Sequence, residues 1–230
     1  GSIGPGTKLP SLGAIAFPEL RDAYEVMADG LLEGGVDVLL VETVQDLLQS
    51  KAALIGCRRA MARAGRDVPL MVQVTVETTG RLLIGSEIGA ALTALDAVRP
   101  DVIGLNCATG PAEMTEHLRY LAQHARTFLS CLPNAGLPSI VDGHTHYDLT
   151  PEAFAEAQSR FVDEFGINVV GGCCGTTPAH LAALVDRLAG RAPAVRTPHH
   201  EPGCASVYSH VPFDQERSVL IIGERTNANG

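Results

Sequence analysis

Tryptophan is absent from this chain, and aromatic residues make up only 4% of its 230 residues. The apolar fraction is nevertheless 46%, so the core is expected to consist mainly of small aliphatic side chains. Such a core is typical of α/β proteins, in which parallel strands are buried on both faces. A chain of this length can form one large domain or two small ones.

Basic residues are also few. The chain has 17 Lys and Arg residues against 26 Asp and Glu residues, which gives a formal net charge of −9. Nucleic-acid binding needs clustered Lys and Arg side chains that neutralise phosphate groups. The charge balance therefore argues against nucleic acid, and likewise against an anionic membrane surface, as a partner.

Three further features are missing. No run of 18 apolar residues is present, so no transmembrane helix is expected. The opening GSIGPGTKLP lacks the basic and then apolar pattern of a signal peptide. Six cysteines are too few for a disulfide scaffold. We therefore expect a cytoplasmic protein, in which grouped cysteines indicate metal or redox chemistry.

The chain contains short runs that are nearly continuous in Val, Ile and Leu, which predicts strands buried on both faces. These runs cover residues 36–43, 68–76, 100–107, 126–134 and 167–174. A helical pattern follows each run, and one more helix is expected at 18–35. Thr150–Pro151 and Thr177–Pro178 are typical helix starts. Regular alternation predicts a parallel sheet, either doubly wound and open or part of a (β/α)8 barrel.

The composition changes after residue 190. Residues 191–217 are rich in Pro and His and lack apolar periodicity, which indicates a linker or a segment wrapped over the surface. Residues 218–230 then start as another buried strand. A second domain is therefore expected to begin there.

Polar residues lie at the carboxyl ends of the predicted strands, where α/β folds build their sites. They are Glu42, Cys107, Asn134, Cys173 and Cys174. Because these strand ends share one face, we expect the three cysteines to lie close together. Three thiolates with one open position are typical of a catalytic zinc site rather than a structural one.

Alternative interpretations apply to each candidate. The three cysteines could be core or redox residues, although a disulfide between the adjacent Cys173 and Cys174 is disfavoured by ring strain. Glu42 could bind a substrate ammonium group or act as an acid near a helix start. Asn134 could orient a ligand, fill the open metal position or form a turn.

Other cysteines and histidines are expected to have no role in a site. Cys57 and Cys131 are interpreted as core residues. The pair His144 and His146 falls in a polar loop. The solvated linker contains His199, His200 and Cys204.

Four segments resemble one protein family specifically. They are VVGGCCGTTPAHL, GLNCATGP, LLVETVQDLLQSKAAL and PNAGLP. Together they are similar to the homocysteine-binding barrel of cobalamin-dependent methionine synthases, in a wider family with betaine– and S-methylmethionine–homocysteine methyltransferases. The final IIGERTNANG resembles the opening strand of the folate-binding barrel that follows in those synthases.

This resemblance implies a fold and a domain order. It implies a (β/α)8 TIM barrel that lacks its first two to three βα units here. Residues 1–190 are then the partial barrel, 191–217 an interdomain linker, and 218–230 the start of the folate (pterin)-binding domain.

The resemblance also implies a function. Cys107, Cys173 and Cys174 correspond to zinc ligands, Glu42 to the acid that binds the amino group of homocysteine, and Asn134 to an asparagine beside the metal. The implied reaction moves a methyl group from methylcobalamin, recharged from 5-methyltetrahydrofolate, to the homocysteine thiolate, giving methionine. Cobalamin and folate are bound by other domains of the same polypeptide. Two alternatives stay open: a stand-alone enzyme using betaine or S-methylmethionine, and a zinc-binding fragment without turnover.

Overall fold

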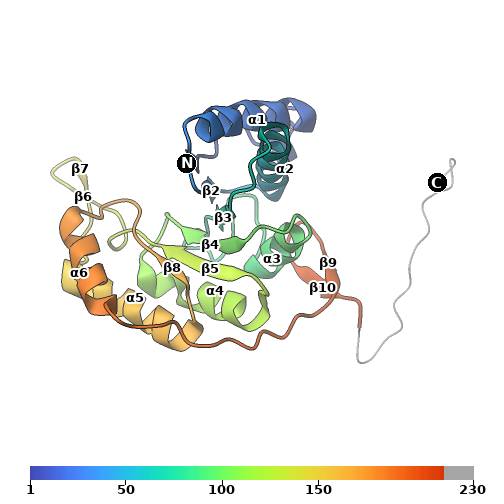
Figure 1. The fold of residues 1–230 in the computed structure, drawn as a ribbon. Coiled ribbons are helices and arrows are strands. Elements are labelled where there is room, and N and C mark those ends of the chain that lie inside the picture. Colours follow the sequence, from blue (N-terminus) through green and yellow to red (C-terminus); the bar gives the residue numbers. More distant parts are fainter. Residues whose placement is uncertain (215–230) are drawn as a thin grey trace, which may run out of the picture.

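A parallel sheet of six strands forms the centre of the molecule, in the order β1-β2-β3-β4-β5-β8 (Figure 1). The computed structural model describes residues 1–214. The strands are β1 (Ser2–Ile3), β2 (Leu39–Val44), β3 (Leu70–Val74), β4 (Val102–Asn106), β5 (Phe128–Leu132) and β8 (Val169–Val170).

All five strands expected from the aliphatic runs are present, as β2, β3, β4, β5 and β8. β1 adds a sixth, since Ser2 and Ile3 pair in parallel with Leu40 and Val41. The parallel α/β fold is thus confirmed. β1 and β8 lie at the two ends of the strand order, so residues 1–214 do not close a barrel. The lack of the first two to three βα units stays a prediction.

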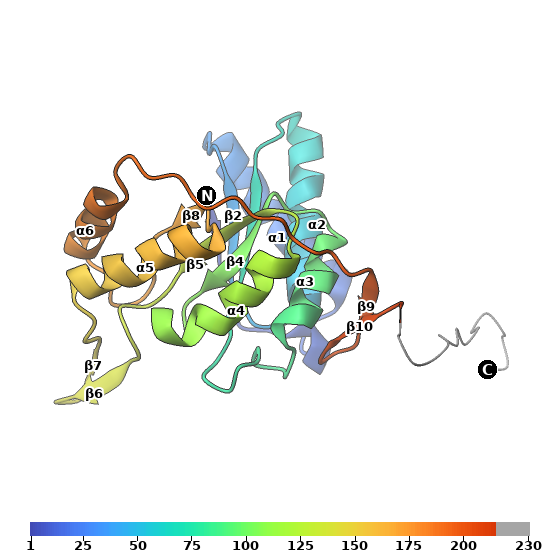
Figure 2. The same ribbon diagram turned by 90° about the horizontal axis from the view of Figure 1, so that it is seen from below.

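Helices follow the strands in chain order, and successive helices pack against one another along the sheet. Figure 2 shows α3, α4 and α5 side by side on one face. The helices are α1 (Phe17–Glu33), α2 (Leu47–Ala64), α3 (Ile88–Asp96), α4 (Pro111–His124), α5 (Pro151–Phe165) and α6 (Pro178–Leu188), with a short 3-10 helix η1 (Pro10–Leu12).

The expected helix starts are confirmed, and each has a polar cap. Thr150 accepts a hydrogen bond from the Ala153 amide at 3.3 Å at the start of α5. At α6, the Thr177 amide donates to Nδ1 of His180 at 3.2 Å. Asp46 caps α2 by accepting from the Leu48 amide at 2.8 Å, so the helix-start acid is Asp46 and not Glu42.

Helices α1 and α2 pack unusually closely at Gly56. A Cβ atom at this position would lie 2.7 Å from the Arg21 carbonyl oxygen and 2.9 Å from the Glu25 amide nitrogen. Real Cβ contacts are longer, so the backbones of the two helices meet here only because residue 56 has no side chain.

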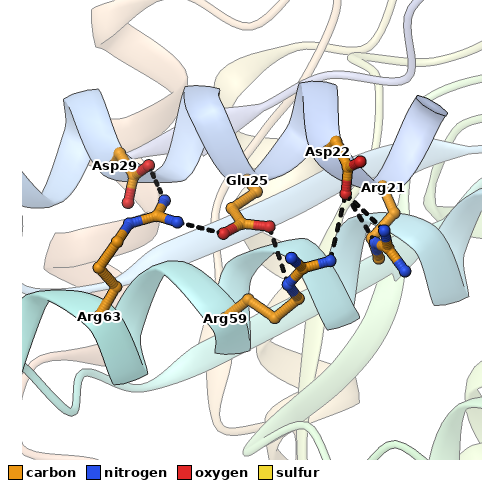
Figure 3. Close-up of polar contacts among 6 residues, drawn as sticks. All are labelled: Arg21, Asp22, Glu25, Asp29, Arg59 and Arg63. Carbon is orange, nitrogen blue, oxygen red and sulfur yellow. Dashed lines mark hydrogen bonds and ion pairs between the residues drawn. The ribbon is translucent and has the colours of Figure 1, made fainter. Parts of the chain in front are cut away.

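A row of ion pairs also joins α1 and α2 (Figure 3). Arg59 contacts Glu25 at 2.9 Å and Asp22 at 3.2 Å, and Arg63 pairs with Glu25 and Asp29. Exposed pairs contribute little to stability, but only 8% of the Glu25 side chain is exposed. Glu25 therefore depends on both arginines for compensation of its buried charge.

The segment after α6 lies along the outside of the helices (Figure 2). Arg196 donates to the carbonyl oxygens of Ala125, at 2.9 Å, and Thr127. The short strands β9 (Gly203–Ala205) and β10 (His210–Pro212) form an antiparallel hairpin that packs on α3. The sequence did not predict this hairpin. The linker assignment for 191–217 stays a prediction, and the folate-domain assignment for 218–230 lies outside the described residues.

A second hairpin, β6 (Ser139–Val141) and β7 (His144–His146), is exposed along its whole length. The expectation of a polar loop for His144 and His146 is confirmed by their exposure, although the loop is a hairpin. Among the described helices, none has both the length and the apolar character that crossing a membrane requires.

We expect Gly56→Ala to lower the free energy of unfolding by about 1–3 kcal/mol, because the added methyl group pushes α1 from α2. Gly30→Ala, at an exposed position of α1 with open space around it, is the matched control. It should raise the free energy of unfolding by about 0.5–1 kcal/mol through helix propensity alone. Urea denaturation followed by circular dichroism measures both. Equal changes in the two variants would contradict the close contact.

Candidate metal centre

Three cysteines meet at the carboxyl edge of the sheet. Cys107 directly follows β4, and Cys173 and Cys174 follow β8. The Cys174 sulfur lies 3.7 Å from that of Cys107 and 3.9 Å from that of Cys173, and all three sulfurs lie within 4.8 Å of one another. The expected convergence of these side chains is therefore present.

The spacing of the sulfur atoms suits a tetrahedral metal. Ligands about 2.3 Å from zinc at tetrahedral corners lie about 3.8 Å apart, close to the two distances above. In residues 1–214 this is the only group of three or more His, Cys, Asp or Glu ligands that could hold one ion. Cys174 is exposed and the other two are half-buried, so one side of the group stays accessible.

The loop after β4 turns sharply to present Cys107. Cys107 and Ala108 have φ values of 62° and 59°, in the left-handed region that residues other than glycine rarely adopt. Backbone hydrogen bonds hold this turn: the Cys107 amide donates to the Leu132 carbonyl at 3.2 Å, and the Thr109 amide donates to the Cys107 carbonyl at 2.7 Å.

The loop after β8 is fixed by the neighbouring loop after β5. The Cys173 amide donates to the Pro133 carbonyl at 2.9 Å, and the Cys174 amide donates to Oδ1 of Asn134 at 3.0 Å. Asn134 is almost completely buried, with 2% of its surface exposed. It thus contacts the cysteine loop through the backbone of Cys174.

The glycines around the two cysteines give the loop its shape. A Cβ at Gly172 would lie 2.3 Å from the Thr176 side chain. Gly175 has a φ of 77°, and a Cβ there would lie 2.3 Å from the ring of Tyr147. Tyr147 therefore packs directly on this loop. This contact could not be predicted from the sequence, because the ring comes from a distant segment.

The thiols of the group influence one another. A hydrogen bond from the Cys173 thiol lowers the pKa of Cys107 to about 6. The same hydrogen bond, together with burial, raises the pKa of Cys173. Without a metal, one thiolate at Cys107 is thus stabilised by its neighbours, and further ionisation is opposed by the charge already present.

Glu42 lies in β2, on the same edge of the sheet. Its carboxylate accepts hydrogen bonds from the Ser2 hydroxyl and, at 3.4 Å, from Nδ2 of Asn106. That same nitrogen lies 3.9 Å from the Cys173 sulfur. Asn106 is completely buried and was missed in the sequence, although it immediately precedes Cys107.

The remaining candidates behave as expected from the sequence. Cys57 and Cys131 are completely buried, which confirms their place in the core. Burial raises the pKa of Cys57 to about 12, so this thiol is protonated at neutral pH. His199, His200 and Cys204 are exposed and lie outside the cysteine group.

Residues 1–188 match the family model described as homocysteine S-methyltransferase. The chain belongs to this family. The matched region covers most of the chain and contains Glu42, Asn106 and all three grouped cysteines. The methyltransferase class predicted from the motifs is confirmed.

Two relatives of this family member are methionine synthases, in agreement with the resemblance found in the motifs. The chain is 57% identical over 230 residues to the enzyme of Mycobacterium tuberculosis (strain ATCC 25618 / H37Rv), covering 100% of this chain and 19% of the relative. It is 56% identical over 235 residues to that of Mycobacterium leprae (strain TN), covering 100% and 20%. The chain thus spans about a fifth of the length of these relatives.

Solved structures support the fold. The homocysteine methyltransferase MmuM from Escherichia coli, in its apo form, aligns with a TM-score of 0.61 at 22% identity, over 81% of this chain and 62% of that chain. Its metallated form aligns with a TM-score of 0.53 at 21% identity, over 73% and 52%. At this identity the likeness shows the fold alone.

The lowered pKa of Cys107 predicts how the metal-free chain reacts with iodoacetamide. The thiolate is the nucleophile, so labelling of Cys107 should be nearly as fast at pH 7 as at pH 8 and should fall about tenfold by pH 5. Peptide mass spectrometry at each pH measures the rate. Cys131 is the control and should stay unlabelled in the folded chain, because it is completely buried. A Cys107 rate that still rises tenfold between pH 7 and pH 8 would contradict the lowered pKa.

Proposed function

We propose that this chain is the homocysteine-binding and zinc-holding part of a methionine synthase. Its proposed reaction is transfer of a methyl group from methylcobalamin to the thiolate of homocysteine, giving methionine and cob(I)alamin. The observation that carries this proposal is the triangle of sulfur atoms at Cys107, Cys173 and Cys174, whose spacing fits a tetrahedral metal with one accessible position.

The position of Glu42 supports an amino thiol as substrate. One amide group, that of Asn106, contacts both the Glu42 carboxylate and the Cys173 sulfur. A small molecule with a thiol and an ammonium group a few bonds apart can therefore place its sulfur at the cysteines and its ammonium at Glu42. Homocysteine has this arrangement.

Each of the five site residues has a defined task in this proposal. The three thiolates hold the zinc, and Glu42 orients the substrate by its ammonium group. Asn134 holds the Cys174 loop in place through its hydrogen bond to the Cys174 amide, and we propose that its side chain lies beside the open metal position when zinc is bound. When bound, zinc lowers the pKa of the substrate thiol, while three thiolate ligands keep that sulfur electron-rich and nucleophilic.

The partners we propose are other domains of the same polypeptide. The chain covers about a fifth of its methionine synthase relatives, which supports the presence of further domains. One of these is proposed to carry methylcobalamin to the cysteine edge, and another to bind the folate that recharges it. The cytoplasmic location stays a prediction of the sequence.

The metal assignment is tested by elemental analysis of the chain after zinc loading and dialysis. We expect about one zinc per chain, lost in Cys173→Ser and Cys107→Ala because two thiolates hold the ion too weakly. Cys204→Ser, an exposed thiol outside the group, is the matched control and should keep its zinc. Full zinc content in Cys173→Ser would sink the metal assignment.

The methyl donor is tested separately. Zinc-loaded chain is incubated with homocysteine and either methylcobalamin, betaine or S-methylmethionine, and methionine is measured. Turnover with methylcobalamin alone supports the proposal. Turnover only with betaine or S-methylmethionine would favour the stand-alone enzymes of the family, and no turnover with any donor would favour a binding fragment.

Glu42→Gln should weaken homocysteine binding by about tenfold or more, because a charge-assisted contact to the ammonium group is lost. Zinc content should stay unchanged, since the carboxylate does not contact the cysteine sulfurs. Calorimetric titration with homocysteine and elemental analysis of the same sample check both. Loss of zinc in this variant would mean that Glu42 has a structural role instead.

A further inference from the structure

Strand β2 contains an irregularity at Glu42. Val41 pairs with Val72 and Val44 pairs with Val74, so two residues of β2, Glu42 and Thr43, stand opposite one residue of β3. This count of two against one is a β-bulge, which bends a strand and redirects a side chain. The bulge therefore decides where the Glu42 carboxylate points.

The bulge requires an uncommon backbone conformation. Thr43 has a φ of 58°, and a β-branched residue in the left-handed region is strained. Such a conformation persists only where the surroundings hold it in place. The groups that contact Thr43 are therefore part of the machinery that positions Glu42.

One side chain holds Thr43 from the neighbouring part of the sheet. Oδ1 of Asn106 accepts a hydrogen bond from the Thr43 amide at 2.8 Å, and Nδ2 of Asn106 contacts the Thr43 hydroxyl at 2.8 Å. Asn106 is itself fixed, because it is completely buried at the end of β4 and its carbonyl accepts from the Thr75 hydroxyl at 3.0 Å.

The side-chain nitrogen of Asn106 also lies near both Glu42 and Cys173. Nδ2 of Asn106 lies 3.4 Å from Glu42 Oε2 and 3.9 Å from the Cys173 sulfur. An asparagine side chain offers one acceptor and two N–H donors, which a carboxylate, hydroxyl or aliphatic side chain cannot supply together. Both the acceptor and the donor group of the Asn106 side chain therefore make contacts.

We propose that Asn106 is a positioning residue that clamps the β2 bulge through Thr43 and holds the Glu42 carboxylate in a fixed relation to Cys173. The inference rests on the proposed function for the roles of Glu42 and Cys173. The clamp itself is a property of the fold. Asn106 need not touch the substrate, because it acts through Glu42.

Two substitutions separate the two tasks of the amide. Asn106→Asp keeps an acceptor for the Thr43 amide but removes the N–H donors. Asn106→Ala removes both. Gln73→Ala is the matched control, because Gln73 is a completely buried amide on β3 that donates to the Ser130 hydroxyl at 3.0 Å and not to Glu42 or Cys173.

The first readout is amide hydrogen exchange of the metal-free chain, followed by NMR. Exchange at Thr43 should be at least about tenfold faster in Asn106→Ala, since the Oδ1 atom that accepts from this amide is gone. It should stay slow in Asn106→Asp. The Thr75 amide, which donates to the Val44 carbonyl at 2.9 Å, reports on β2–β3 pairing just after the bulge and should be unaffected. Unchanged Thr43 exchange in Asn106→Ala relative to Gln73→Ala would overturn the clamp.

The second readout is homocysteine affinity of the zinc-loaded chain. Asn106→Asp should weaken binding by about tenfold, and in a Glu42→Gln background the further loss should be much smaller, because the two residues act as one unit. Equal losses in both backgrounds would overturn the action through Glu42. Absence of zinc or homocysteine binding in the unmodified chain would contradict the proposed function, while the exchange measurement would still decide on the clamp.

Discussion

The parallel pairing of β4, β5 and β8 is the constraint on which the cysteine group depends. Neighbouring strands lie about 4.8 Å apart, so β4 and β8, separated by β5, are about 10 Å apart at their ends. The sulfur atoms are nevertheless within 4.8 Å of one another. The difference is bridged by loops that lean over the end of β5, where Pro133 and Asn134 accept hydrogen bonds from the amides of Cys173 and Cys174. The centre is therefore built on three strands and not on two.

The strands and helices that carry this site could be predicted from the sequence, because the sequence patterns that mark them are local. Aliphatic runs mark the strands, Thr-Pro pairs mark helix starts, and parallel strands must end on one edge. The meeting of Cys107 with Cys173 and Cys174 followed from these facts. The role of Asn106 could not be predicted, because a bulge depends on the pairing register between two strands. The hairpins β6–β7 and β9–β10 were also missed, since three-residue strands carry too few residues to show a pattern.

Polar residues inside the sheet show how such a small site is kept rigid. Gly104 on β4 has no side chain, and a Cβ there would lie 2.1 Å from the Ser130 hydroxyl oxygen. This space allows Gln73 to reach across β4 to Ser130 on β5. Asn106 is a second buried amide, two residues further along β4, at the edge where the site lies. Two buried amides thus tie neighbouring strands together, Gln73 in the interior of the sheet and Asn106 beside the cysteine group.

The shortness of β8 has a consequence for the last part of the fold. This strand has two residues and is the edge of the described sheet, paired only with β5 through Val169 and Val170. An ion held jointly by Cys107 and by the two cysteines after β8 is a crosslink from the middle of the sheet to its edge. Ion binding and the order of the β8–α6 unit are then thermodynamically coupled. Metal supply would in that case govern resistance of this region to proteolysis, and not only its chemistry.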